Sequence, residues 1–283
     1  MKEALYYEKL EKLMVHCRLC PVECVIAPGK HGACGVRVNK GGTLYSEIYG
    51  RITSAALDPI EKKPLYHYHP GEYIFSIGTK GCNLHCSFCQ NWQISQDLEA
   101  PTDGITSKEA VARAKESGSF GIAYTYNEPF IWYEFVLETA KLAKESGLEN
   151  VLVTNGYVNM EPLEEMLPYI NAMNIDLKAF NEDFYRKICA GKLANVREVI
   201  KRAAGDCHVE LTTLIISGLN DSEKEMREEA EWIRDNVGAE TPLHLSRYFP
   251  CYKMKVEATP LKTMERAREI AMSSLKYVYL GNV

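Results

Sequence analysis

The chain has 283 residues, with 33 Lys and Arg against 38 Asp and Glu, and its formal net charge is −5. This balance gives no electrostatic reason to expect nucleic acid as a partner. No run of about 18 apolar residues occurs, and the charged N-terminus lacks an apolar signal-peptide core, so we expect no membrane partner. We therefore expect a cytoplasmic protein that is long enough to bury a large core.

The distribution of the cysteines is the first feature that indicates a chemistry. Most of the ten cysteines fall in two groups, and the isolated Cys189, Cys207 and Cys251 are expected to be small buried hydrophobes. The first group is Cys17, Cys20, Cys24 and Cys34, and the second is Cys82, Cys86 and Cys89. In a reducing compartment, clustered cysteines indicate metal ligands or redox groups rather than disulfides.

The beginning of the chain is rich in turns rather than in long periodic segments. Residues 1–70 contain the first cysteine group, in a setting where APGKHGACGVRVNKGG places Gly and Pro at turn spacing. We expect this range to be a small Cys-rich, metal-binding segment. We expect residues 71–283 to form the core domain.

From residue 73 onward, strand-like apolar runs alternate with amphipathic helical runs. A helix over 106–118 begins with a capping box formed by Thr106 and Glu109, and further helices are predicted over 129–147 and 221–238. The predicted strands are 73–78, 121–126, 151–154, 172–177, 208–216, 242–247 and 277–280. The alternation predicts a parallel sheet with crossover helices, either an open sheet or a full or partial barrel. In either architecture the chemistry belongs at the carboxyl ends of the strands.

The stretch TKGCNLHCSFCQNW places three cysteines directly after the first predicted strand. One interpretation is half of a structural zinc site that is completed from elsewhere in the chain. Three thiolates in one loop suit a cubane 4Fe–4S cluster better, because each can reach a different iron. Such a cluster ordinarily takes four thiolates, so three leave one iron open to a substrate or cofactor.

The sequence CNLHCSFC resembles the C-x3-C-x2-C loop of radical S-adenosylmethionine enzymes, including the aromatic Phe88 before the last cysteine. The resemblance implies that Cys82, Cys86 and Cys89 are catalytic and hold a 4Fe–4S cluster. In that superfamily the open iron is chelated by S-adenosylmethionine. One electron then cleaves the sulfonium to give a 5′-deoxyadenosyl radical, which abstracts hydrogen from a substrate.

Three further motifs resemble those of the activating enzymes of pyruvate formate-lyase. YTYNEPF carries Asn127 and Glu128, TNG carries Asn155, and DLK carries Asp176 and Lys178. The resemblance implies that these five residues bind the cofactor, with Glu128 accepting from the methionyl amino group and Lys178 pairing with the cofactor carboxylate. Each motif also has a structural alternative. Lys178 would be an exposed lysine at a helix start, Glu128 a carboxylate favoured by a helix dipole, and Asn155 part of an Asn-Gly turn.

Over nearly its whole length, the chain resembles the radical enzymes of the AmmeMemoRadiSam system. It rests on HCRLCPVECVIAPGKHGACGVR, LDPIEKKPLYHYHPG, AYTYNEPFIWYEF and LHLSRYFPCYKM. The resemblance implies an α/β fold with a partial (β/α)6 barrel. It implies a small-molecule or protein substrate and a reducing electron donor. The alternatives are a glycyl-radical activase that acts on a partner protein, and a metal-cluster module for electron transfer or binding.

Two further expectations concern the edges of the proposed site. The four N-terminal cysteines can supply a complete set of four ligands. They suit either a structural zinc ion or an auxiliary 4Fe–4S cluster, and the sequence does not favour one over the other. Arg247, at the end of the sixth predicted strand, suits an anionic group of substrate or cofactor, or a structural ion pair. We also expect an incompletely closed barrel with the N-terminal segment packed beside it.

Overall fold

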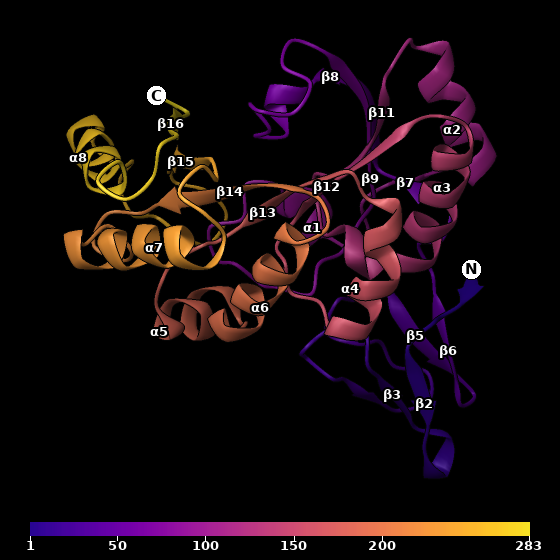
Figure 1. Cartoon of the computed structure of the whole chain (residues 1–283). Helices are drawn as coiled ribbons and strands as arrows, with labels where there is room; N and C mark the ends of the chain where they lie inside the picture. The colour runs from indigo at the N-terminus through magenta and orange to yellow at the C-terminus, as the bar shows by residue number, and fades with distance from the viewer.

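A single eight-stranded sheet organises the computed structural model, which describes residues 1–283 (Figure 1). The strand order is β16-β15-β14-β13-β12-β11-β9-β8, and all neighbours pair in parallel except β8 and β9. The strands are β8 (Ser54–Pro59), β9 (Tyr73–Gly78), β11 (Gly121–Tyr124), β12 (Glu149–Thr154), β13 (Ala172–Asp176), β14 (His208–Ile215), β15 (Leu243–Arg247) and β16 (Val278–Gly281). The predicted parallel sheet is therefore confirmed.

The two edge strands, β8 and β16, are not paired with each other, so the sheet is open. The sequence analysis missed β8, whose residues SAALDP include small side chains and a proline that give little strand signal. This strand lies within residues 1–70 but is hydrogen bonded along β9. The division of the chain at residue 70 stays a prediction, and one strand of the sheet comes from before it.

The helices connect successive parallel strands, and α5, α6 and α7 lie below β13 and β14 in Figure 1. The capping box that opens α2 is present, since Thr106 accepts from the Glu109 backbone and the Glu109 side chain accepts from the Thr106 backbone. The segment predicted as one helix over 129–147 is divided into a 3₁₀ turn, Pro129–Trp132, and α3. The helices are α1 (Trp92–Ser95), α2 (Ser107–Glu116), α3 (Tyr133–Glu145), α4 (Met160–Met166), α5 (Glu182–Phe184), α6 (Leu193–Ala204), α7 (Glu223–Asn236) and α8 (Leu261–Ala271). Shorter turns are the 3₁₀ segments Glu11–Leu13, Ile60–Lys62 and Leu167–Tyr169 and the π segment Tyr185–Cys189.

Small antiparallel sheets make up most of the N-terminal segment, and its strands β2, β3, β5 and β6 project from the core at the lower right of Figure 1. Their orders are β1-β6-β5, β2-β3-β4 and β10-β7. The strands are β1 (Lys2–Glu3), β2 (Tyr7–Lys9), β3 (Val15–Cys17), β4 (Val25–Ile26), β5 (Arg37–Lys40), β6 (Thr43–Ser46), β7 (Arg51–Ile52) and β10 (Asp103–Gly104). Val15 and Leu44 belong to the same hydrophobic cluster as the core strands, so this segment shares a continuous core with the rest of the chain.

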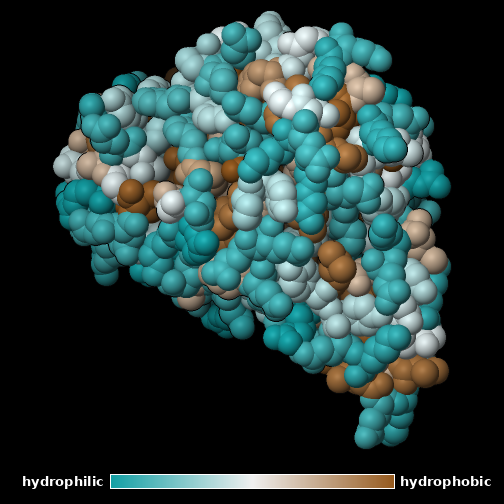
Figure 2. All heavy atoms as spheres, turned by 45° about the vertical axis from the view of Figure 1, so that its right-hand side comes forward, coloured by the Kyte–Doolittle hydropathy of each residue, from teal (hydrophilic) through white to brown (hydrophobic).

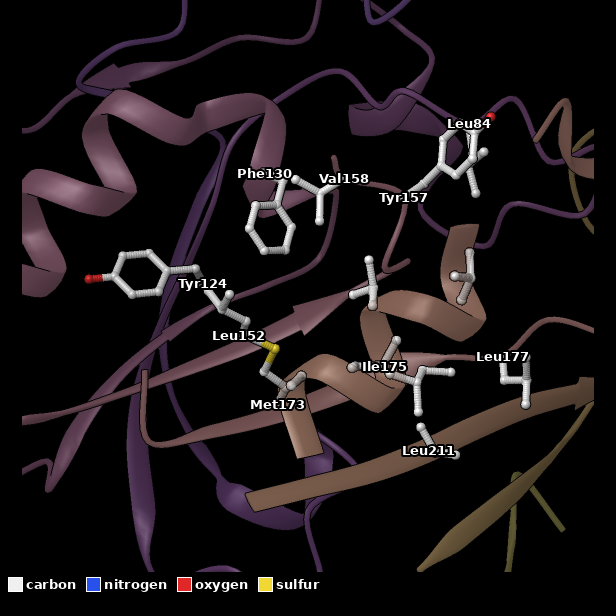
Figure 3. Packing of buried hydrophobic residues seen from close by; sticks show 14 of the residues in the cluster. Leu84, Tyr124, Phe130, Leu152, Tyr157, Val158, Met173, Ile175, Leu177 and Leu211 are labelled. Atoms are coloured by element: carbon white, nitrogen blue, oxygen red, sulfur yellow. The ribbon is translucent and has the colours of Figure 1, made fainter. Parts of the chain in front are cut away.

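The main hydrophobic core lies between the sheet and its helices. Figure 3 shows Leu152, Met173 and Leu211 from neighbouring strands pointing into it, with Tyr124 beside them. The side of the molecule drawn in Figure 2 is mainly hydrophilic. None of the helices combines the length and the hydropathy that a membrane span requires.

Candidate active site

A cavity of about 290 Å³ opens where the parallel strands end. Parallel strands present their carboxyl ends at one edge of a sheet, so the loops after β9, β11, β12 and β13 meet there. The sequence-predicted residues on its wall are Cys82, Cys86, Phe88, Cys89, Asn127, Glu128, Asn155, Asp176 and Lys178. Motifs that are separated by almost 100 residues of sequence therefore converge on one cavity.

Hydrogen-bond donors surround the sulfurs of the three-cysteine loop. The backbone N–H of Leu84 donates to Cys82 Sγ at 3.4 Å, and Asn155 Nδ2 lies 3.5 Å from the same sulfur. Cys89 Sγ lies 3.0 Å from Ser95 Oγ. Such donors stabilise thiolates that carry the charge of an iron–sulfur cluster. The residues present therefore fit a cluster held by Cys82, Cys86 and Cys89.

The environment of the three thiols differs from one to the next. Burial raises the pKa of Cys82 well above its usual value, and nearby Glu128 adds to that effect. The pKa of Cys86 is lowered, because Cys189 donates a hydrogen bond to its sulfur and Lys178 lies nearby, against the effect of burial. Cys86 is thus the sulfur whose surroundings most favour the thiolate that a metal requires.

Glu128 is a buried carboxylate that is held from several sides. Its Oε1 accepts from the Phe130 N–H at 2.9 Å and from Thr154 Oγ1 at 2.8 Å. Its Oε2 accepts from the Asn155 N–H at 2.8 Å. Burial raises the pKa of Glu128 to about 7, although these hydrogen bonds oppose the increase. The carboxylate is preorganised to accept from a cation, such as an ammonium group, that enters the cavity.

Lys178 is the buried cation of the cavity. Its Nζ lies 2.9 Å from Asp176 Oδ2 and 6.0 Å from the centre of the Phe88 ring. Burial alone would lower the pKa of Lys178, but Asp176 together with the Cys86 and Cys189 thiols raises it well above the usual value. The lysine therefore stays charged and can pair with an anion, although Asp176 already occupies one side of it.

Asn127 lines the cavity but directs both ends of its amide to the cysteine loop. Its Oδ1 accepts from the Thr79 N–H at 3.1 Å, and its Nδ2 donates to the Gly81 carbonyl at 3.0 Å. Gly81 has φ +90°, a left-handed conformation that favours glycine. Asn127 thus fixes the start of the loop that carries Cys82, which is a positioning role that its motif did not indicate.

Two of the cysteines that the sequence analysis set aside as isolated lie beside the site. Cys189 is fully buried next to Cys86, and its carbonyl accepts from the His85 N–H at 2.9 Å. The Cys251 thiol donates to the Cys89 carbonyl at 3.5 Å. Neither lies near these partners in sequence, so no spacing signal could have identified them.

The four N-terminal cysteines, Cys17, Cys20, Cys24 and Cys34, line one small and largely apolar cavity. All ten cysteines are free thiols, and no three His, Cys, Asp or Glu side chains already converge on a single ion position. Burial raises the pKa of Cys20 to about 12 and that of Cys34 to about 11. The predicted grouping is therefore reproduced in space, while the identity of its metal stays a prediction.

Arg247 lies apart from the other predicted site residues. It does not line the active-site cavity, whereas its neighbour Ser246 does. Its Nε donates to the Thr259 carbonyl at 2.7 Å, and its guanidinium lies over the Phe249 ring. The side chain points away because residues alternate along a strand. Its assignment to cofactor binding stays a prediction that this geometry does not support.

The outer wall of the cavity includes polar residues that the sequence analysis did not identify. They are Lys62, Gln90, Asn91, Ser95, Gln96, Thr125, Tyr126, Thr212 and Ser246. Tyr126 donates to Asp58 of the edge strand β8 at 2.5 Å, and Lys62 lies 3.2 Å from the same carboxylate. Because β8 was not predicted, the part of the wall that Tyr126 and Lys62 form around Asp58 was not predicted either.

Comparison with known proteins gives the site a family context. The profile of the Radical SAM superfamily matches residues 76–233, a range that begins in β9 and contains the three-cysteine loop. An uncharacterized protein of Methanocaldococcus jannaschii is 46% identical over 288 residues, covering 100% of this chain and 86% of that protein. The four N-terminal cysteines lie outside the matched range.

Two characterised relatives are more distant. The pyruvate formate-lyase-activating enzyme of Clostridium pasteurianum is 25% identical over 163 residues, covering 55% of this chain and 67% of that protein. A radical SAM methyltransferase from Sphaerobacter thermophilus matches in structure with a TM-score of 0.59 at 18% identity, covering 75% of this chain and 67% of that one. At that identity the structural likeness shows the fold alone.

Proposed function

The chain belongs to the radical SAM superfamily, and from that premise we propose that Cys82, Cys86 and Cys89 hold its 4Fe–4S cluster. The observation that supports the assignment is the convergence of these three thiols with Glu128 and Lys178 on one cavity at the strand ends. When bound, the cluster supplies the electron that cleaves S-adenosylmethionine to a hydrogen-abstracting 5′-deoxyadenosyl radical. The protein is thus a radical SAM enzyme rather than a module that only holds metal.

We propose that the remaining polar groups orient S-adenosylmethionine. Glu128 has an oxygen that accepts only from the Asn155 N–H, which leaves it able to accept from the methionyl ammonium group. Lys178 is the buried cation suited to the methionyl carboxylate, with Asp176 holding its Nζ in place. Phe88 supplies an apolar surface beside it that restricts water.

The finer family assignment is also a proposal. The AmmeMemoRadiSam branch is supported by the motifs that extend through the N-terminal segment. The substrate in this proposal is a small molecule or a protein, and a reducing electron donor acts in the cytoplasm, where thiols stay reduced. A glycyl-radical activase acting on a partner protein is the second candidate, favoured by the similarity to the Clostridium pasteurianum enzyme.

We propose a partial barrel for the core, in which the seven-stranded parallel part curves around the cavity and β8 extends one edge. The support is the open strand order together with loops after four successive strands that reach one cavity. The Cys-rich segment before residue 70 packs beside the core and shares β8 with it.

The test is anaerobic cleavage of S-adenosylmethionine by protein that has been reconstituted with ferrous iron and sulfide. We expect 5′-deoxyadenosine to form with dithionite as reductant, and Cys86→Ala to abolish it. Cys207→Ser is the matched control, because this thiol lies away from the cavity and donates to the Ala203 carbonyl. Wild-type protein that forms no 5′-deoxyadenosine, or Cys86→Ala protein that forms as much as wild type, contradicts the proposal.

A further inference from the structure

The four N-terminal cysteines lie against the loop that carries Cys82. Asn83 lines the cavity of the N-terminal thiols, while the residue before it, Cys82, lines the active-site cavity. On the other side of Cys82, a Cβ added to Gly81 would stand 2.8 Å from the Cys34 carbonyl oxygen. The two thiol groups are therefore separated by little more than the backbone of one loop.

Side-chain hydrogen bonds continue this contact between the two cavities. Asn83 Oδ1 accepts from Asn155 Nδ2 at 3.0 Å, and the same Nδ2 lies 3.5 Å from Cys82 Sγ. Asn83 Nδ2 donates to the Tyr157 carbonyl at 2.6 Å, which fixes its side chain. Asn83 also lines the N-terminal cavity together with Cys20. A short bonded and hydrogen-bonded route thus leads from Cys82 to the cavity of the N-terminal thiols.

Hydrogen-bond donors face two sulfurs of the N-terminal group. Ala33 N–H donates to Cys24 Sγ at 3.3 Å, and Arg37 Nη1 lies 3.7 Å from Cys17 Sγ. The backbones of Val22 and Val36 lie close to the other two, Cys20 and Cys34. N–H donors of this kind stabilise thiolates and set the reduction potential of an iron–sulfur cluster. The arrangement fits ligands rather than idle thiols.

The polarity of the cavity suits a redox cluster. Arg37, which is 1% exposed, lies beside Cys17 Sγ, and its charge is compensated by Glu134. The remaining wall is apolar, with Leu19, Ile26 and Ile131. An enclosed, apolar setting protects a cluster from water and tunes its potential.

Attachment of the segment does not depend on a metal. Arg37 forms a buried ion pair with Glu134 of α3. Asn159 N–H donates to the Leu19 carbonyl at 3.0 Å, and Asn159 Nδ2 donates to the Arg18 carbonyl at 2.8 Å. Because the cysteine loop is already held to the core, a purely structural zinc ion would add little at this position.

We infer that Cys17, Cys20, Cys24 and Cys34 hold a second iron–sulfur cluster, which passes electrons to the cluster site at Cys82, Cys86 and Cys89. The inference rests on the proposed function for its electron acceptor. A low-potential one-electron carrier protein gives one electron to the N-terminal cluster, which passes it to the active-site cluster. There the electron is consumed as the sulfonium carbon–sulfur bond of S-adenosylmethionine breaks, so one electron enters for each cleavage.

The first experiment identifies the metal without disturbing the N-terminal segment. Cys86→Ala protein is purified anaerobically and analysed for iron, sulfide and zinc before and after reconstitution. We expect about four iron and four sulfide per chain in this variant and about eight of each in wild type. Zinc bound to the N-terminal cysteines, or an absence of metal from the variant, overturns the inference.

The second experiment tests the direction of electron flow. Reduced flavodoxin should reduce the cluster that remains in Cys86→Ala, as seen by electron paramagnetic resonance. Cys20→Ser should lower the rate of 5′-deoxyadenosine formation at least tenfold with flavodoxin and less than twofold with dithionite. A remaining cluster that flavodoxin does not reduce, or equal losses with the two reductants, overturns the relay. Cys207→Ser again serves as the control.

The two proposals fail in different ways. If wild-type protein forms no 5′-deoxyadenosine with dithionite, the proposed function fails, while the metal content of Cys86→Ala still decides the second site. If cleavage occurs and Cys86→Ala holds zinc, the proposed function stands and the relay is wrong.

Discussion

Arg37 of β5 and Glu134 of α3 form an ion pair whose side chains are 1% and 3% exposed. The pair joins the N-terminal segment to the core across nearly 100 residues of sequence. Arg37 also donates to the Leu5 carbonyl at 3.0 Å, and Glu134 Oε1 accepts from the Leu5 N–H at 2.8 Å. The connection between β1 and β2 is thereby fixed to the same charge pair.

Breaking this pair from one side should destabilise the protein. Arg37→Met leaves Glu134 as an uncompensated buried charge, and we expect a loss of about 3–5 kcal/mol in the free energy of unfolding. The double variant Arg37→Met/Glu134→Leu removes both charges and should recover most of that loss. Anaerobic urea unfolding measures both. A double variant no more stable than the single one would show that the charge is not the cause.

A surface pair provides the matched control. Arg202, in the last turn of α6, forms an ion pair with Asp206, which follows the helix. Both side chains are more than a third exposed. Arg202→Met should change the free energy of unfolding by less than about 1 kcal/mol, since solvent screens such pairs.

The placement of the active site could be predicted because it depends on local sequence and on a rule of topology. The CNLHCSFC loop follows an apolar strand, and parallel strands bring their carboxyl ends together. The order of Cys82, Glu128, Asn155 and Lys178 along the chain therefore became their order across the sheet. No knowledge of side-chain packing was needed for this step.

The unpredicted features depend on side-chain packing, most of it between distant segments. Cys189 meets Cys86 through a π segment, and Asp176 pairs with Lys178 where a cofactor group was expected. Asn127 turns both ends of its amide to the loop rather than toward the cavity. The contact between the two cysteine groups likewise follows from tertiary packing, to which a single sequence gives no direct signal.

S-adenosylmethionine binding should depend on both charges in the cavity. Glu128→Gln and Lys178→Met each remove a charge-assisted contact worth about 1.5–3 kcal/mol, so we expect the dissociation constant to rise roughly ten- to a hundredfold. Anaerobic equilibrium dialysis of reconstituted protein measures it. Lys201→Met is the control, because its exposed partner Glu198 lies on the outer surface of α6. Unchanged binding in both site variants would refute the assignment.

The tight contact beside Cys82 can be tested with a single methyl group. In Gly81→Ala the new Cβ would stand 2.7 Å from Val36 Cγ1 and 2.8 Å from the Cys34 carbonyl. The backbone must move, so we expect loss of iron and a stability loss of more than about 1 kcal/mol. Gly71→Ala is the control, because Gly71 has a similar φ of +86° with nothing within 4 Å of its Cβ position. Equal effects in the two variants would show that backbone strain alone is responsible.

Glu229 should make the stability of the protein depend on pH. Its side chain is buried in α7, Oε1 accepts from Thr213 Oγ1, and Oε2 has no hydrogen-bond partner. Burial raises the pKa of this carboxyl to about 8, with a smaller contribution from the neighbouring Glu225. A carboxyl with this environment is therefore neutral in the native protein at neutral pH.

The sign of the effect follows from proton release on unfolding. The unfolded chain gives up this proton near its usual pKa of about 4.3, while the native protein holds it to a pH of about 8. Between these values the free energy of unfolding falls as pH rises, by at most roughly 1.4 kcal/mol per pH unit. Glu229→Gln cannot titrate, so its stability should fall less steeply from pH 5 to pH 8, as measured by urea unfolding. Glu228→Gln, at an exposed position on the same helix, should keep the wild-type slope. Parallel curves for wild type and Glu229→Gln would mean that Glu229 is already ionised in the native protein.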